Sequence, residues 1–317
     1  MNYLIISILI FIIIIIIYYK NNTYSFVAIN NKNKFKEHNK IKYFEKKLAN
    51  WYSYGENDYF KLDHGVNYYS FFERLGLMKM IIIKKDNHIV GTGCGVLRII
   101  PQKYDLLNKE NFRYVWYICD LKIDKKHRGN LLSFKMLKKC LKYKKYSSKC
   151  YGISMDNNNK NKINKINNIN KINNIKTKNP ILKMAQKIPF LKFKSGGKLL
   201  IYSLDYNDMK RILPLLVKHR GSINFVSLKG KKDLLLKSTK KPVNLLHLQW
   251  GFQNNINTDD IIYFNPIKNY QHMFCCPKND PLVKELFIYN IRTDVSATII
   301  HYNMDNFDWK FVLTSEI

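Results

Sequence analysis

The sequence lacks the short motifs that mark the common metal and redox sites. Its six cysteines form no Cys-x-x-Cys pair, and no histidine stands at zinc-finger spacing from them. We therefore expect no metal site, and small buried thiols in a reducing compartment rather than a disulfide framework. The neighbours Cys275 and Cys276 leave a vicinal redox pair open, but the end of a strand is the interpretation that we favour.

Acidic residues and arginine are both scarce. The 317 residues include 54 Lys and Arg against 23 Asp and Glu, which gives a net charge of +31, yet only seven of the cations are Arg. Lys, Asn and Ile are abundant throughout the chain, and no local basic-aromatic module stands out. The charge therefore does not favour specific nucleic-acid binding, although a field this positive attracts anionic partners such as acidic lipids and polyanions.

The two commonest phosphate-binding loops are also missing, because neither GxxxxGK[ST] nor GxGxxG occurs. Residues 120–137 nevertheless contain an apolar strand end, a basic turn around Arg128 and Gly129, and then an amphipathic helix. A turn that opens a helix after a strand brings unpaired N–H groups and the positive end of the helix dipole to one point. This stretch therefore predicts a phosphate site of another kind.

One long apolar run is present, at the N-terminus. Residues 3–19 include ten Ile and no charge, and as a helix they would span roughly 25 Å, at the short end for a bilayer. A cleaved signal peptide needs a basic start and a small-residue cleavage site, and both are missing. Cations follow the run from Lys20 onward, so the positive-inside rule predicts a single-pass membrane protein whose main part faces the cytosol.

Hydrophobic periodicity predicts alternating helices and strands in the rest of the chain. Residues 157–178 are almost wholly Asn, Lys and Ile, and we expect a disordered insertion there. Asn179 and Pro180 predict a helix start. The predicted helices are 41–51, 63–76, 131–143, 180–188, 209–217 and 281–289. The predicted strands are 78–84, 89–100, 113–123, 150–155, a hairpin of 190–194 with 198–204, 223–228, 243–250, 273–276, and a closing hairpin of 295–303 with 309–315; an early strand at 24–29 is left open.

Motif and element order together resemble the GNAT superfamily of acyl-CoA-dependent N-acyltransferases, over about residues 41–204. In that family a strand ends in V-x-P-x-x-R-G-x-G, and the turn grips the coenzyme A pyrophosphate. The core motif Q/R-x-x-G-x-G/A reads here from Lys126 to Leu131. Lys126 keeps a donor and a positive charge, whereas Leu131 replaces a small residue. The resemblance implies an α/β fold with a mixed sheet.

The resemblance also implies acetyl-CoA, or another acyl-CoA, as the co-substrate. Main-chain amides of residues 128–133 would hold the diphosphate, with added charge from two nearby side chains. The backbone after Asp120 would pair with the pantetheine arm as an added strand does. The residues implied to bind the cofactor are Leu121, Lys122, Ile123, Lys126, Arg128, Gly129, Asn130, Leu131, Ser133 and Asn179.

Transfer to an amine needs a base that takes the proton of the attacking nitrogen. Asp120 is the one carboxylate in an apolar strand, and burial would make it a stronger base; a structurally hydrogen-bonded Asp is the alternative. Tyr117 stands near the place of a catalytic Glu in some family members. His64 lies in the region that shapes the acceptor pocket, and it is a base, a substrate contact or a solvated residue at a helix start. The Tyr that usually serves as general acid has no counterpart in residues 180–188.

We therefore expect a transmembrane anchor at 1–20, a linker at 21–40, a GNAT-like domain at 41–204, and a C-terminal α/β region at 205–317 that echoes a degenerate second lobe. The expected function is a membrane-anchored N-acetyltransferase that acts on an amine acceptor. Two alternatives stay open. One is a catalytically inactive GNAT scaffold that binds at a membrane surface, and the other is a polybasic binder of membranes or nucleic acid.

Overall fold

The computed structural model describes residues 24–48, 51–54, 58–103, 111–156, 179–188, 191–251 and 260–317. The apolar run at 3–19 and the low-complexity insertion at 157–178 lie outside these residues. No helix in the described part of the chain is long and apolar enough to cross a membrane. The chain divides into two compact units, one made of Met1–Leu48, Lys79–Cys94 and Asp120–Leu141, and the other of Ala49–Met78, Gly95–Cys119 and Lys142–Ile317.

The strands of the first unit follow the order β1-β4-β5-β6. The open prediction of an early strand is confirmed, because β1 pairs antiparallel with β4 and sets Phe26 opposite Ile83. Asp86 and Asn87 join β4 to β5, and their positive φ angles of 48° and 63° fit the tight two-residue turn of a hairpin. The strands are β1 (Ser25–Ala28), β4 (Leu77–Lys85), β5 (His88–Pro101) and β6 (Phe112–Ile123), of which the last three also give residues to the second unit.

Two helices complete the first unit, α2 (Lys34–Leu48) and α4 (Leu132–Cys140). The prediction of a linker at 21–40 is wrong, because α2 starts within it. Although its composition is polar, α2 has a buried face, on which Glu37 pairs with Lys84 of β4 at 2.7 Å. The core of this unit gathers Ile81, Ile83, Val90, Leu132 and Met136.

The second unit is built on a mixed sheet, as the sequence predicts. The strand order is β5-β6-β7-β14-β8-β13-β11-β9-β12. Two of the pairs, β6 with β7 and β11 with β13, are parallel, whereas β14 pairs antiparallel with both β7 and β8. The further strands are β7 (Cys150–Met155), β8 (Lys194–Leu204), β9 (Ile223–Ser227), β11 (Leu245–Trp250), β12 (Ile261–Tyr263), β13 (Gln271–Pro277) and β14 (Ser296–Tyr302).

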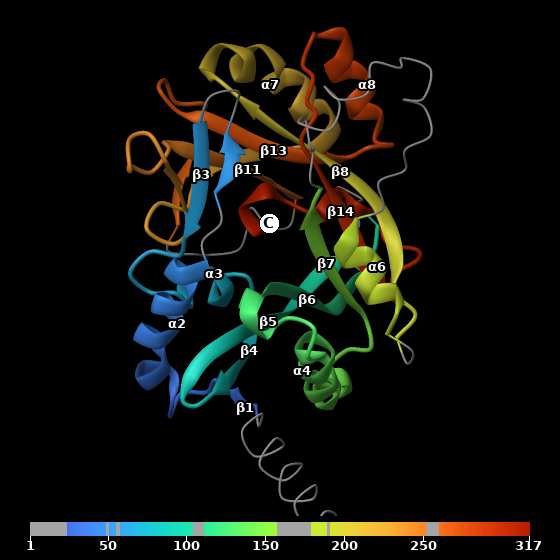
Figure 1. Ribbon diagram of the computed structural model, residues 1–317. Helices are drawn as coiled ribbons and strands as arrows, with labels where there is room; N and C mark the ends of the chain where they lie inside the picture. Colours follow the sequence, from blue (N-terminus) through green and yellow to red (C-terminus); the bar gives the residue numbers. More distant parts are fainter. Residues whose placement is uncertain are drawn as a thin grey trace, which may run out of the picture. The chain divides into compact units, whose positions relative to one another are not determined.

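Helices cover this sheet at two places. In Figure 1, α7 (Tyr206–Arg220) and α8 (Pro281–Ile288) lie side by side next to β8 and β13, and α6 (Pro180–Gln186) lies against β8 and β14. The core beneath α7 and α8 includes Leu216, Phe225, Leu248, Phe274 and Leu286, which are all fully buried. Asn179 caps α6 and Pro180 occupies its first turn, which confirms the predicted helix start.

A small antiparallel sheet, which the sequence analysis missed, has the order β10-β3-β2. Its strands are β2 (Tyr52–Tyr54), β3 (Asp58–Asp63) and β10 (Asp233–Leu236). The predicted helix at 63–76 is wrong except for one turn, α3 (Ser70–Glu73). The aromatic residues of this segment are buried around His64, partly in a loop and partly in the single turn of α3, rather than along one face of a long helix, so their helical spacing misled the prediction.

Two predicted hairpins are also wrong. Residues Lys194–Leu204 form one continuous strand, because Gly196 and Gly197 lie in the strand beside a register shift of β14 rather than in a turn. After β14, the predicted strand at 309–315 is replaced by the short 3-10 turns η5 (Trp309–Phe311) and η6 (Thr314–Glu316). Both are buried, so their apolar pattern reflects burial rather than strand pairing.

Candidate functional site

The turn after β6 has the backbone geometry of an anion cradle. Asp124 starts it by accepting a hydrogen bond from the amide of Lys126 at 3.0 Å, within the 3-10 turn η1 (Lys125–His127). Gly129 has a φ of 87° and Leu131 a φ of 54°, so the chain turns through left-handed conformations before α4 begins. A Cβ at Gly129 would meet nothing within 4 Å, which leaves its backbone open to a ligand.

The amides of this turn are available to an outside acceptor. Within the described part of the chain, the main-chain N–H groups of residues 129–133 have no hydrogen-bond partner, and the Lys135 amide bonds to the Leu131 carbonyl at 2.9 Å. A side-chain oxygen often caps a helix start, but the cap of α4 is Leu131, which has none and is 68% exposed. Five amides therefore stand at the positive end of the α4 dipole.

Hydrogen bonds from two side chains stabilise the turn. Arg128 Nε donates to the carbonyl of Ile123 at 3.2 Å, which ties the turn to the end of β6. Asn130 Nδ2 donates to the His127 carbonyl at 3.1 Å and to the Tyr24 hydroxyl at 3.3 Å. Lys126 is exposed beside the turn. The predicted cofactor residues from 126 to 133 thus lie together, as a continuous turn must place them.

Asp120 lies in a buried polar cluster of the first unit. Its φ of 52° interrupts the extended backbone of β6, and its carboxylate accepts from Lys122 Nζ at 2.5 Å and from the Thr92 hydroxyl at 3.3 Å. Lys122 also reaches Glu45 at 3.2 Å. Burial alone would favour the neutral amine, but the two carboxylates outweigh it and raise the pKa of Lys122. These contacts match the structurally bonded alternative for Asp120.

In the second unit, β6 and β7 pair over a short distance. Trp116 lies opposite Cys150 and Tyr117 opposite Tyr151, and no further pair joins the two strands among the described residues. At Gly152 a Cβ would lie 3.0 Å from the Ile118 carbonyl oxygen, so a larger residue would have to push the two strands apart by a few tenths of an ångström. The GNAT resemblance implies that these two strands separate where the pantetheine arm enters.

Tyr117 belongs to a buried cluster of the second unit. Its hydroxyl donates to the Glu316 carbonyl at 2.7 Å, and its ring stacks on Tyr151 with centroids 5.0 Å apart. Burial raises the pKa of Tyr117. The Arg98 guanidinium pairs with the Glu316 carboxylate and donates to the Tyr151 hydroxyl at 2.5 Å. Sequence reasoning missed Arg98 and Glu316, and the only signal was a charged residue in each of two apolar segments.

His64 and Asn179 are held by contacts inside the second unit. His64 is buried, with its ring 5.0 Å from Tyr68 and 5.2 Å from Phe72 by centroid, so the solvated alternative is wrong. Asn179 Oδ1 accepts from the first amides of α6, and its Nδ2 donates to Asp156 at 3.1 Å. The amide that was predicted to contact the cofactor therefore serves as a helix cap.

All six cysteines are free thiols, and Cys275 and Cys276 lie buried near the end of β13, as the favoured interpretation predicts. Burial raises the pKa of Cys276 to about 12, which keeps this thiol protonated and unreactive. No cluster of His, Cys, Asp or Glu that would hold a metal ion occurs in the described ranges.

Comparison with known proteins adds distant relatives. No protein-family model matches the chain. Several solved structures similar to this chain are GNAT acetyltransferases. A relative from Acanthamoeba polyphaga mimivirus, "Uncharacterized protein L340", is 27% identical over 256 residues, which cover 79% of this chain and 68% of the relative.

The similar GNAT structures differ in how much of the chain they cover. Arabidopsis thaliana NAA60 with a bisubstrate analogue is 13% identical, with a TM-score of 0.33 over 56% of this chain and 87% of that one. The GCN5-related glucosamine N-acetyltransferase region of a fungal GH3 β-N-acetylglucosaminidase is 8% identical, with a TM-score of 0.43 over 88% of this chain and 38% of that one. At such low similarity, function has to be argued from the residues of this chain.

Proposed function

We propose that this protein is an acyl-CoA-dependent N-acyltransferase. One observation carries the proposal, namely the five open amides of residues 129–133 at the start of α4, next to a glycine whose backbone is exposed. A diphosphate suits this turn because its oxygens accept several N–H groups at once, and the helix dipole and Lys126 favour its charge. The GNAT resemblance implies that the whole cofactor is acetyl-CoA or a longer acyl-CoA.

The reaction forms a C–N bond between a neutral amine and the acyl carbon while the C–S bond of the thioester breaks. One proton leaves the amine, and one reaches the departing thiolate of CoA. Asp120 is the candidate base, and its carboxylate would have to exchange Lys122 for the amine proton. Asp120→Asn should therefore lower turnover by about 100-fold or more while acyl-CoA binding is kept.

Calorimetric titration of the full chain in detergent with acetyl-CoA tests the proposal. Gly129→Glu should abolish binding, because it sets a carboxylate against the diphosphate. Gly197→Glu is the matched control, since Gly197 also has a positive φ, of 100°, and open space where its Cβ would lie. Absence of binding by the natural protein at about 1 mM ligand, or equal loss in both variants, would disprove the proposed site.

A binding module without turnover is the second candidate. Tyr117 and His64 have their polar or aromatic surfaces engaged inside the protein, and the usual Tyr is missing from α6. Release of free CoA thiol, followed over a panel of primary amines, separates the two functions. Binding without thiol release from any amine would favour the module.

We also propose that residues 3–19 anchor the protein in a membrane with its main part on the cytosolic side. The uncharged Ile-rich composition of this run supports the proposal. Alkaline extraction of membranes should leave the natural chain in the pellet and release a chain that lacks residues 1–20. Release of both chains would contradict the anchor.

A further inference from the structure

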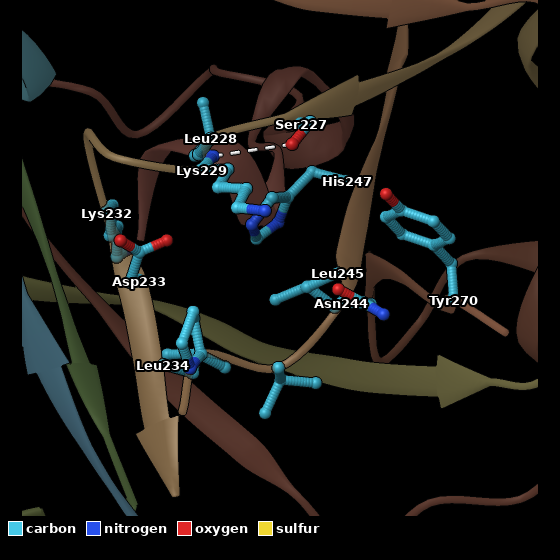
Figure 2. A pocket seen from close by; sticks show the side chains of 12 residues that line it. Ser227, Leu228, Lys229, Lys232, Asp233, Leu234, Asn244, Leu245, His247 and Tyr270 are labelled. Atoms are coloured by element: carbon cyan, nitrogen blue, oxygen red, sulfur yellow. Dashed lines mark hydrogen bonds between the residues drawn. The ribbon is translucent and has the colours of Figure 1, made fainter. Parts of the chain in front are cut away.

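The small sheet β10-β3-β2 has one face turned toward the body of the second unit. Leu62 of β3 lies opposite Leu234 of β10, and both are half-buried. Leu234 lines a pocket together with Leu245 of β11, as Figure 2 shows. Because side chains alternate along a strand, Tyr59 and Lys61 of β3 point to the opposite face.

That opposite face joins two aromatic rings to three lysines. Trp51, directly before β2, is 37% exposed, and Tyr59 is 47% exposed. The Nζ atoms of Lys61 and Lys240 lie 5.5 and 5.2 Å from the centroid of the Trp51 ring. Lys237 Nζ lies 5.4 Å from the centroid of the Tyr59 ring, and the Lys237 amide donates to the Tyr59 carbonyl at 2.7 Å. We call these five residues the aromatic-lysine face.

The carboxylates nearest to this face in the sheet have other partners. Asp58 Oδ1 accepts the Ser238 amide at 3.3 Å, and its Oδ2 accepts the Ser238 hydroxyl. Asp63 accepts the Gly65 amide at 2.8 Å. Among the residues that the structure describes, no carboxylate forms an ion pair with the three lysines of the aromatic-lysine face. Their charge is therefore available to an anionic partner.

The aromatic-lysine face is absent from the local sequence pattern. Its members come from residues 51–61 and 237–240, which the pairing of β3 with β10 brings together. For this reason the sequence analysis found no basic-aromatic module, although both residue types are abundant in the chain.

We propose that the aromatic-lysine face binds single-stranded nucleic acid with little sequence preference. In the protein alone, the rings and the ammonium groups are partners of each other. A nucleotide serves both at once, because its base stacks on a ring while its phosphate takes the ammonium group that the base displaces. The strand has to be single, since the bases of a duplex are already covered on both sides.

A lipid surface fits this face less well. More than half of the surface of Trp51 and of Tyr59 is already covered, so each ring has little apolar surface left to enter a lipid layer. An acidic lipid also offers the lysines a charge but offers the rings no flat group on which to stack.

Fluorescence anisotropy of a labelled oligothymidylate of about 12 nucleotides tests this surface. The full chain is used in detergent and without CoA, so the result does not depend on the proposed transferase. The natural chain should bind the strand, and its affinity should fall as salt rises, because lysines that neutralise phosphates release counterions. Inorganic polyphosphate of equal charge should compete at least about tenfold more weakly, because it has no bases.

Two variants separate stacking from charge. Tyr59→Leu should weaken binding by about tenfold and leave the salt dependence unchanged. Lys237→Gln should weaken binding and flatten the plot of log affinity against log salt by about 0.7. Tyr206→Leu and Lys268→Gln are the matched controls and should change neither quantity, because these residues form a similar pair, with Nζ 5.9 Å from the ring centroid, outside the small sheet.

Lys237 is exposed, so its replacement keeps the test independent of folding. No binding at low salt, equal losses in the matched controls, or equal competition by polyphosphate would overturn the proposal. Competition by a short-chain phosphatidylserine as strong as that by unlabelled oligothymidylate would also overturn it, because the face would then be a lipid site.

Discussion

Single residues decide much of the stability of the second unit, and Arg98 is the clearest example. Arg98 and Glu316 are both almost completely buried. Two nitrogens of the Arg98 guanidinium each contact one oxygen of the Glu316 carboxylate. Burial disfavours the cation, but Glu316 and Tyr151 outweigh it, so the pKa of Arg98 is raised. A buried pair of this kind costs little when intact and much when one member is removed.

We therefore expect Glu316→Gln to destabilise the protein by about 3–5 kcal/mol, because it leaves the Arg98 cation buried without a counter-charge. The double variant Arg98→Met, Glu316→Leu should recover most of that loss. Urea unfolding of the natural chain, both single variants and the double variant measures the coupling. Additive effects would show that the pair does not act as one unit.

The sequence could not predict this pair. Residues 98 and 316 are more than two hundred positions apart, and each looked like an isolated charge in an apolar pattern. The site residues from Lys126 to Leu131 were different, because a turn of consecutive residues brings its own members together. Asp120 stood out in the sequence as the one carboxylate in an apolar strand. Its contacts with Thr92 and Lys122, however, depend on how the strands pack.

At the scale of elements, most strands and long helices follow from local pattern. β7 has the predicted bounds, and β4, β5, β6, α7 and α8 differ from theirs by a few residues at most. The failures share a cause. Residues 63–76, 309–315 and the pair of glycines at 196 and 197 have patterns that burial or a bulge produces as readily as a regular element does.

Asp280 shows how one residue joins two elements. Its Oδ1 caps α8 by accepting the Leu282 amide at 3.0 Å, and its Oδ2 pairs with Arg220 at the end of α7. Asp280→Asn keeps the cap but leaves Arg220, which is 1% exposed, without its carboxylate. We expect a loss of about 3–5 kcal/mol in urea unfolding.

Asp205→Asn is the matched control for that variant. Asp205 caps α7 by accepting the Asp208 amide at 2.9 Å, and it forms no ion pair with the described residues. Asn is as good a cap as Asp, so this variant should unfold near the natural midpoint. Equal losses in the two variants would mean that the cap, not the ion pair, matters at Asp280.

At the scale of the whole chain, Asp156 ties together segments that are distant in sequence. It follows β7 directly, and its carboxylate accepts from Thr298 of β14 at 2.6 Å, Ser296 at 2.7 Å and Asn179 before α6 at 3.1 Å. Burial would favour the protonated acid, but these hydrogen bonds outweigh it and lower the pKa of Asp156.

A lowered pKa gives stability that is present above the ordinary value near 3.8 and is lost as the pH falls through the folded-state value. Asp156→Asn should therefore cost about 1–2 kcal/mol at neutral pH, and the difference from the natural chain should shrink as the pH falls below the ordinary carboxyl pKa near 3.8. Urea unfolding across this range measures it. Asp305→Asn, an exposed pair with Lys194, should show little effect at any pH, and a constant difference for Asp156→Asn would contradict the linkage.

The sequence by itself determined the strand, turn and helix around Gly129, the strands β4 to β7, and the starts of α6 and α8. These features depend on side-chain period and turn chemistry within about a dozen residues. Only the tertiary structure decided that β14 lies between β7 and β8, that Glu316 meets Arg98, and that lysines after β10 meet the rings of Trp51 and Tyr59. Such pairings join segments far apart in the chain, and a local pattern carries no information about which distant partner will cover it.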